Sequence, residues 1–162
     1  MATASDSTAA LQAFQHNLNH LYLKPTDSDP ELFSYVDEPL GTVRMAFVRF
    51  QGQTVTALAT FFASDPVGGV MEFHGFYAVP EAYQNQGRAK DILSASLRQL
   101  AQNITQTSLD AIRVNVVVEA DNTPAQKVAA AVISKTPRPV TDQATGRPAL
   151  LYSVTLPRPA VH

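Results

Sequence analysis

The sequence predicts an α/β (α+β) fold in which a mixed, mostly antiparallel central sheet is flanked by helices on both faces. Three observations predict it. Residues 42–79 contain three segments rich in β-branched and aromatic residues, joined by short turns. The segments on either side repeat apolar residues at helical spacing. A later apolar segment, 112–118, suits an inner strand that is covered on both sides.

The N-terminal part is predicted to be helical. Apolar residues recur there at helical spacing: Leu11, Phe14, Leu18, Leu21 and Tyr22. Ser5 and Ser7 offer N-caps for this first helix. Asp29-Pro30-Glu31 is typical of an N-cap followed by proline at the first helical position, which predicts a short second helix through about Val36.

The middle of the chain is predicted to form three antiparallel strands. The first two, 42–50 and 54–63, are joined by Gln51-Gly52-Gln53, which can turn a hairpin. Asp65-Pro66-Val67-Gly68-Gly69 is a second turn, and the third strand covers 70–79 before Pro80. Short turns between consecutive strands predict a meander.

Helices and strands alternate after Pro80. An apolar stripe predicts a helix over 88–103, and the strand 112–118 follows it. Thr123-Pro124 begins another helix, which is expected to stop before Pro137. The last strand is predicted at 149–156, with room for one short strand before it.

Composition limits the classes of protein to which the chain can belong. Its 162 residues fit one domain, 1–162, with 1–6 and 157–162 expected to be frayed. The absence of cysteine excludes disulfides, a thiol nucleophile and thiolate zinc sites. A net charge of −2 argues against a general nucleic-acid binder. No apolar stretch is long enough to span a membrane and Met1–Ser7 does not resemble a secretion signal, so we expect a cytoplasmic protein without a membrane partner.

The segment 79–90 has the composition of an anion site between a strand and a helix. The first amides of a helix lack intrahelical partners, and the helix dipole adds positive charge there. Gly87 lets a ligand approach the backbone, while Arg88 and Lys90 add positive charge. This combination suits a phosphate or diphosphate. The alternative is an ordinary turn whose glycine merely closes a loop.

The same segment also resembles a known motif. Gln84-x-x-Gly87-x-Ala89 is similar to the (Gln/Arg)-x-x-Gly-x-(Gly/Ala) acyl-CoA motif of the GNAT N-acetyltransferase superfamily. Asn122-x-x-Ala125, which opens the helix after strand 112–118, resembles the second conserved segment of that family. The resemblance covers about 42–156 in the order of elements and about 79–126 in sequence motifs.

The resemblance implies an acyl-CoA site, with acetyl-CoA or another acyl-CoA as co-substrate and no metal. Main-chain amides between Asn85 and Lys90 would hold the CoA diphosphate. The strand end at 77–79 would pair with the pantetheine arm, which Asn122 would touch, and one strand amide would polarise the thioester carbonyl. The implied cofactor-binding residues are Tyr77, Ala78, Val79, Gln84, Asn85, Gln86, Gly87, Arg88, Ala89, Lys90, Asn122 and Ala125.

The candidate catalytic residues are Glu72, His74 and Tyr83. Glu72 and His74 are two residues apart on one strand, so they share a face, and either could accept a proton from an attacking amine. The alternative is that Glu72 pairs with Arg44 or Arg49. The family often carries a tyrosine seven residues after the asparagine as the acid for the leaving thiolate. Here that position is Ala129. Tyr83 or Tyr152 could supply the acid in its place, although Tyr152 is better interpreted as core packing in the last strand.

These features predict an N-acyltransferase that moves an acetyl or short acyl group from acyl-CoA to a primary amine by direct attack. The acceptor would be a small-molecule or peptide amine, and a homodimer is left open. The absent tyrosine favours an alternative, a non-catalytic GNAT-fold module that binds acyl-CoA or a protein. A phosphate-binding domain unrelated to CoA is a third reading.

Two weaker patterns lie near the N-terminus. An acidic set could steer a cationic amine or could form solvated turns: Asp27, Asp29, Glu31, Asp37 and Glu38. His16 and His20 have the spacing of a metal-binding pair but lack a third ligand, so they are better interpreted as helix-surface residues.

Overall fold

In the computed structural model, which describes residues 4–159, eight strands form one mixed sheet in the order β1-β2-β3-β4-β5-β6-β8-β7. The strands are β1 (Lys24–Pro25), β2 (Phe33–Asp37), β3 (Arg44–Gln51), β4 (Thr54–Ala63), β5 (Val70–Ala78), β6 (Ala111–Glu119), β7 (Arg138–Thr141) and β8 (Pro148–Pro157). Only β5 and β6 pair in parallel; all other described neighbours are antiparallel. The predicted mixed, mostly antiparallel sheet is therefore confirmed.

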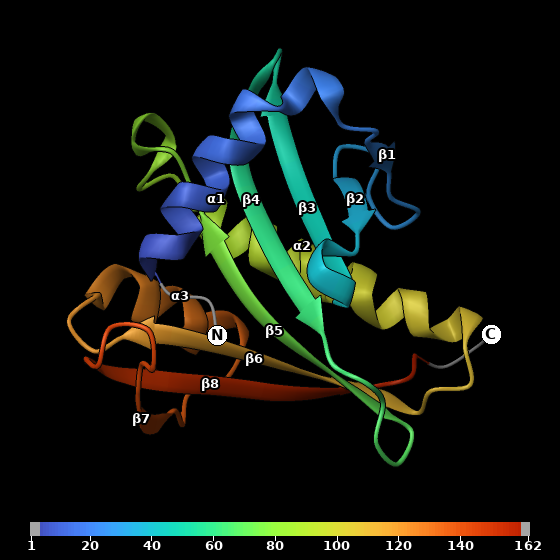
Figure 1. Cartoon of the computed structure of the whole chain (residues 1–162), viewed down its shortest axis with the longest axis vertical. Helices are drawn as coiled ribbons and strands as arrows, with labels where there is room; N and C mark the ends of the chain where they lie inside the picture. Colours follow the sequence, from blue (N-terminus) through green and yellow to red (C-terminus); the bar gives the residue numbers. More distant parts are fainter. Residues whose placement is uncertain (1–3, 160–162) are drawn as a thin grey trace.

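Helices lie on both faces of this sheet, as predicted (Figure 1). They are α1 (Ala4–His16), α2 (Arg88–Asn103) and α3 (Thr123–Val132), with short 3₁₀ turns η1 (Leu18–His20), η2 (Pro39–Gly41), η3 (Glu81–Tyr83) and η4 (Ile104–Gln106). Leu11 of α1 is buried with Val48 and Leu58 on one face. On the other face, α2 and α3 cover a larger apolar cluster that includes Phe47 and Phe61. Burial of about 25 cal/mol per Å² of apolar surface makes these two clusters the main stabilising contribution.

The segment 29–36 is a correction to the sequence prediction, because it holds a strand in place of a helix. The Asp29 carbonyl accepts a hydrogen bond from the Leu32 amide at 3.1 Å, so the proline begins only a single turn. Phe33 and Tyr35 then alternate onto the α1 side of the sheet, and β2 pairs with β3. The period of two in Phe33 to Asp37 therefore outweighs the helix-start signal of Asp-Pro-Glu.

The first helix is shorter than the apolar pattern predicts. It ends at His16, and the Asn17 side chain donates to the Ala13 carbonyl at 2.9 Å. Such side-chain bonds compete with continuation of a helix. Leu18 still packs against the α1 cluster, but Tyr22 is 76% exposed.

The predicted frayed ends, 1–6 and 157–162, lie partly outside the described residues, which exclude 1–3 and 160–162. Within the described part, helix α1 begins at Ala4, and Pro157 still pairs with Ala111 in the sheet. The Arg158 guanidinium donates to the Thr107 carbonyl at 2.7 Å and to the Leu109 carbonyl at 2.9 Å. These bonds fix the exit of β8 against the loop before β6. Within the described residues, no helix is long and apolar enough to cross a membrane.

Candidate functional site

The site begins where β5 and β6 separate. Their parallel pairing ends at Gly75 and Val116, although β5 continues beside β4 to Ala78 and β6 continues beside β8 to Glu119. At the branch point, a Cβ on Gly75 would lie 2.6 Å from the Phe61 ring, so glycine is required there. Beyond this point, the strand β5 has lost its partner on the β6 side, and its peptide groups there are available to a ligand.

Strand β5 ends between two clefts because its side chains alternate between the two faces. Tyr77 and Val79 pack with the cluster under α2 and α3, whereas Ala78 packs with the cluster under α1. The first cleft, called here the cofactor cleft, has a volume of about 800 Å³ and is lined by the end of β5, the loop before α2 and the start of α3. The second, called here the acceptor cleft, has a volume of about 920 Å³ and lies between α1, the start of β4 and the segment after β5.

The loop that lines the cofactor cleft presents unpaired main-chain amides. Asn85 and Gly87 have positive φ values of 61° and 77°, which turn successive peptide groups outward before α2. Among the described residues, none accepts a hydrogen bond from the N–H groups of 85–90; the first amide of α2 with a partner is that of Asp91, which bonds Gly87. Consecutive free amides at a helix N-terminus form an anion-binding concavity.

Gly87 leaves this concavity open. A Cβ placed on it would meet no protein atom within 4 Å, so the space above the glycine belongs to the cleft. Its left-handed backbone is also a conformation that most L-residues disfavour.

Positive side chains surround the same loop. Arg88, Lys90 and Lys127 line the cofactor cleft, and no carboxylate does so among the described residues. The Arg88 guanidinium lies over the Tyr83 ring, 5.1 Å from its centroid, and donates to Gln86 Oε1 at 3.2 Å. Stacking holds the cation in place while leaving N–H groups free to bind an anion.

The two halves of the cofactor cleft are joined by Tyr77. Its hydroxyl donates to the Ala125 carbonyl at 2.8 Å and so connects β5 with α3. Burial raises the pKa of the Tyr77 phenol above its ordinary value, so the group stays protonated and acts as a donor. Asn122 caps α3, because its Oδ1 accepts from the Ala125 amide at 3.2 Å. The side-chain oxygen expected at the pantetheine arm is therefore engaged in a cap.

The structure places the three candidate catalytic residues in two different regions. Glu72 and His74 share a face, as their spacing predicts, and their side chains lie 3.3 Å apart. They line neither cleft, and Glu72 faces Arg113 at 3.7 Å in place of Arg44 or Arg49. Tyr83 lines the cofactor cleft beside the loop, under Arg88. Tyr152 is buried in the core.

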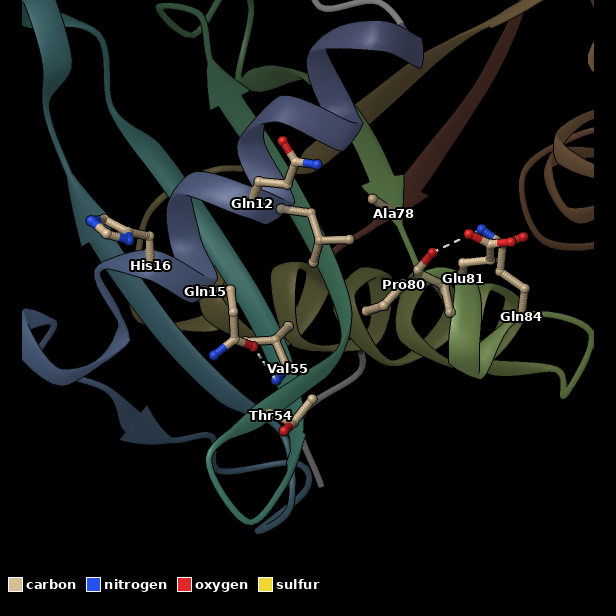
Figure 2. A pocket seen from close by; sticks show the side chains of 11 residues that line it. Gln12, Gln15, His16, Thr54, Val55, Ala78, Pro80, Glu81 and Gln84 are labelled. Carbon is tan, nitrogen blue, oxygen red and sulfur yellow. Dashed lines mark hydrogen bonds between the residues drawn. The ribbon is translucent and has the colours of Figure 1, made fainter.

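The acceptor cleft was not found by sequence reasoning. Figure 2 shows its walls: α1, the start of β4, and the segment after β5. Gln15 of α1 fixes the first two walls together, since its Oε1 accepts from the Val55 amide at 2.7 Å and its Nε2 donates to the Gln53 carbonyl at 3.0 Å. Gln84 fixes the third, because its Nε2 donates to the Val79 carbonyl at 3.0 Å. The only signal in the sequence is a set of polar residues on α1 next to Leu11.

The two clefts carry opposite charge and touch each other. Val79 and Gln84 line both of them. Among the described residues, the titratable groups that line the acceptor cleft are His16 and Glu81, and no lysine or arginine does so. An anionic ligand in the cofactor cleft and a cationic ligand in the acceptor cleft could therefore meet at the end of β5.

The acidic set singled out in the sequence does not contribute to the acceptor cleft. Asp29 is 2.7 Å from Arg49, and Asp37 accepts from Arg44 Nε at 2.8 Å. The guanidinium of Arg49 lowers the pKa of Asp29 by hydrogen bonding to its carboxylate. None of the five acids lines the acceptor cleft. Across residues 4–159, no three His, Cys, Asp or Glu side chains are placed to hold a metal ion.

Comparisons with known proteins assign the fold. No family model and no curated protein matches the sequence. Among solved structures, the ribosomal L7/L12 alpha-N-protein acetyltransferase RimL in complex with coenzyme A is 16% identical, with a TM-score of 0.54; the match covers 70% of this chain and 62% of RimL. Naa50 of Arabidopsis thaliana, in complex with a bisubstrate analogue, is 12% identical, with a TM-score of 0.53 and coverage of 67% and 71%. A GNAT-family acetyltransferase of Streptococcus pneumoniae is 13% identical, with a TM-score of 0.52 and coverage of 70% and 66%.

The chain has the GNAT fold. The predicted resemblance is thus confirmed at the level of architecture. In this GNAT fold, the cofactor cleft lies at the fork of β5 and β6, next to the N-terminus of α2.

Proposed function

We propose that the chain transfers an acetyl or short acyl group from acyl-CoA to a primary amine. The observation that carries the proposal is the row of free main-chain amides at 85–90 in the cofactor cleft, which three cations also line. This cleft adjoins the anionic acceptor cleft at Val79. Charge of opposite sign on the two sides of one strand end suits a reaction between a phosphorylated cofactor and an ammonium substrate.

The residues present fit an acyl-CoA. The amides of 85–90 would bind the diphosphate, and Arg88, Lys90 and Lys127 would balance its charge. The unpaired edge of β5 beyond Gly75 would hold the pantetheine arm by main-chain hydrogen bonds. When bound, acyl-CoA supplies an activated thioester carbonyl, and a fixed main-chain N–H of the strand end would stabilise the developing oxyanion.

The chain needs to do little more than position the two reactants. The nitrogen lone pair of a neutral amine forms the new bond to the acyl carbon as the carbon–sulfur bond breaks. An ammonium and a thioester then yield an amide, a thiol and one proton, so one proton must reach solvent. Glu81 and His16, which line the acceptor cleft, are the groups placed to receive it. Positioning of this kind can supply several kcal/mol of the barrier reduction.

The structural neighbours support acyl transfer from CoA. RimL is named as an alpha-N-protein acetyltransferase, and Naa50 was solved with a bisubstrate analogue written CoA-Ac-MVNAL. The RimL name describes acetyl transfer to a protein α-amino group. The present chain spans 62% of RimL, so the activity of that whole protein is carried over here only as a proposal.

One observation favours a second candidate, a non-catalytic module that binds acyl-CoA. Ala129 occupies the α3 position where the resemblance leads us to expect a tyrosine acid, and it is fully buried. A CoA thiolate is a good leaving group, so the absence of that acid does not by itself prevent turnover.

Two measurements on the full chain separate these candidates. Titration calorimetry with CoA tests the cofactor cleft, and thiol release from acetyl-CoA over a panel of amines tests transfer. We expect CoA to bind and at least one amine to release thiol. Binding without release for every amine would leave the non-catalytic module, and the absence of CoA binding would contradict both.

A further inference from the structure

The acceptor cleft is built for a single positive charge. Glu81 is its only lining carboxylate among the described residues, and it lies next to Pro80 at the end of β5. The acids that could have attracted a polycation are elsewhere, and two of them, Asp29 and Asp37, are paired with arginines. A polyamine or aminoglycoside carries several ammonium groups, of which this cleft could neutralise only one.

Besides Glu81, His16 and Thr54, the polar side chains that line the cleft are the carboxamides of Gln12, Gln15 and Gln84. Gln12 projects from α1, and Gln84 lies on the opposite wall beside Glu81, with Ala78 between the walls in Figure 2. The Gln84 Oε1 accepts no hydrogen bond from any described residue, and the Gln12 amide makes none with them. A free carboxamide such as that of Gln12 has the same donor and acceptor groups as a peptide bond, and Gln84 adds its oxygen as a second acceptor because its Nε2 is engaged by Val79. Together the two side chains can bind successive peptide groups.

The floor of the cleft is apolar and fixed. Leu11 and Val55 are buried beneath it, and Gln15 fastens α1 to the Val55 amide. A rigid apolar floor accepts a small uncharged side chain without reorganisation. The cleft volume of about 920 Å³ exceeds the needs of a simple alkylamine and can hold several residues of an extended chain.

The titratable groups of the cleft favour a weakly basic amine. An α-amino group has a pKa of about 7.7–8.0, whereas a lysine amine has one of about 10.4. At pH 7.5 roughly a third of α-amino groups are therefore neutral and able to attack, compared with about 0.1% of lysine amines. An α-amine needs far less help from a base, and the cleft offers only one carboxylate and one imidazole.

We infer that the acceptor is the α-amino group of a peptide or protein whose first side chain is small and uncharged. Glu81 binds the ammonium end, and the Gln12 and Gln84 amides bind the first peptide groups. The inference rests on the proposed acyl transfer, and it names the class of acceptor for that reaction.

Four acceptors test the inference by thiol release from acetyl-CoA. They are Ala-Gly-Ser-Gly amide, the N-acetylated peptide Gly-Lys-Ser-Gly amide, spermidine and ethanolamine. We expect kcat/KM for the free α-amine peptide to exceed each of the others by at least about ten-fold, since the neutral fraction alone favours it by more than that over lysine. Equal or better use of spermidine or of the lysine peptide would overturn the inference and leave the proposed acyl transfer intact. Thiol release with none of the four would overturn both.

A binding measurement gives a second readout that does not depend on turnover. CoA is joined to one peptide sequence either through the α-amine or through a lysine side chain, and both conjugates are titrated into the protein. We expect the α-linked conjugate to bind at least about ten-fold more tightly, because only it places peptide groups beside Gln12 and Gln84. Equal affinity of the two conjugates contradicts the assignment.

The variant Gln12→Leu tests whether the preference for an α-amine peptide arises in the acceptor cleft. It should raise KM for the α-amine peptide about five-fold, the value of one or two neutral hydrogen bonds, without changing the affinity for CoA. Gln102→Leu is the matched control, since Gln102 is an exposed glutamine of α2 that lines neither cleft. A Gln12 variant with unaltered peptide KM would contradict the role of the amide.

Discussion

The two clefts that meet at Val79 are made from different parts of the polypeptide. The cofactor cleft is lined mainly by the loop before α2 and the first turn of that helix, together with the end of β5 and the start of α3, and it presents the free main-chain amides of 85–90. The acceptor cleft brings together α1, a β-hairpin and the segment after β5, and its binding groups are side chains. Recognition of a ligand by the first cleft would therefore depend on backbone shape, and recognition by the second would depend on residue identity.

This difference explains why a short sequence motif marks the cofactor cleft, whereas no motif marks the acceptor cleft. Backbone shape at 85–90 needs a glycine and small neighbours at fixed spacing, so it leaves a pattern in the sequence. Side chains such as Gln12 and Glu81 are far apart in sequence and need no fixed spacing. Variants that disturb each cleft separately can therefore test whether the two sites are independent.

The largest effect is expected from Gly87→Asn. Asparagine tolerates the left-handed backbone of this position, but its side chain would enter the open space over the free amides. Loss of one or two charge-assisted hydrogen bonds predicts about 100-fold weaker CoA binding by calorimetry. Gly146→Asn is the matched control, because Gly146 also has a positive φ and open space but lines neither cleft. Unchanged CoA affinity in the Gly87 variant would show that the diphosphate does not lie on this loop.

A smaller effect is expected from Lys127→Met, which removes a cation of the cofactor cleft and keeps the length of the side chain. CoA should bind about five- to ten-fold more weakly, and its affinity should depend less steeply on salt. The KM of the amine should not change, because Lys127 is absent from the acceptor cleft. Lys135→Met, an exposed lysine beyond α3, should have neither effect. If both lysine variants behave alike, the general charge of the protein and not this cleft governs affinity.

Glu81→Gln is expected to change the KM of the amine and to leave the affinity for CoA unchanged. The substitution keeps shape and removes the carboxylate of the acceptor cleft, so KM for an ammonium substrate should rise about five-fold, the upper value for exposed ion pairs. CoA affinity should stay the same. Glu31→Gln serves as control, since Glu31 is an exposed acid outside the cleft. A loss of CoA affinity in the Glu81 variant would mean that the two clefts are coupled.

The sequence predicted those parts of the fold that depend on local pattern. The meander, the helix α2, the strand β6 and the start of α3 at Thr123-Pro124 all follow from apolar period and helix-start residues. The strand β2 was missed because Asp29-Pro30 carries a helix-start signal that applies to one turn only. Its partner β3 decided the outcome, and pairing across a sheet cannot be seen in the sequence of one strand.

The same limit applies to the candidate site, of which the sequence indicates only the part made of adjacent residues. The loop 84–90 was proposed from its sequence because a phosphate site of this kind depends on adjacent residues; the structure shows that the loop lines a cleft with free amides. Lys127, by contrast, enters the cofactor cleft from α3, and nothing in its own neighbourhood marks it as a ligand. Glu72 and His74 were chosen because they share the strand that leads to the site. At about 3.3 Å per residue, His74 lies roughly 16 Å along β5 from Val79, too far for direct proton transfer.

The smallest expected effect concerns Asp29, an acid for which the sequence left two interpretations, steering of a cationic amine or a solvated turn. Asp29 forms an ion pair with Arg49, which also binds Asp91 in the first turn of α2 at 2.5 Å, so its charge supports the fold behind the cofactor cleft. Hydrogen bonding to Arg49 lowers the pKa of Asp29 in the folded protein. A lowered folded pKa gives stability that is present above the unfolded pKa of about 3.9 and is lost as pH falls through the folded value. Urea unfolding between pH 6 and pH 3 should therefore show that Asp29→Asn reduces the free energy of unfolding by about 0.5–1 kcal/mol at pH 6 and by less at pH 3. The same variant should leave the KM of the amine unchanged. A rise in that KM would show that Asp29 contributes to binding of the amine.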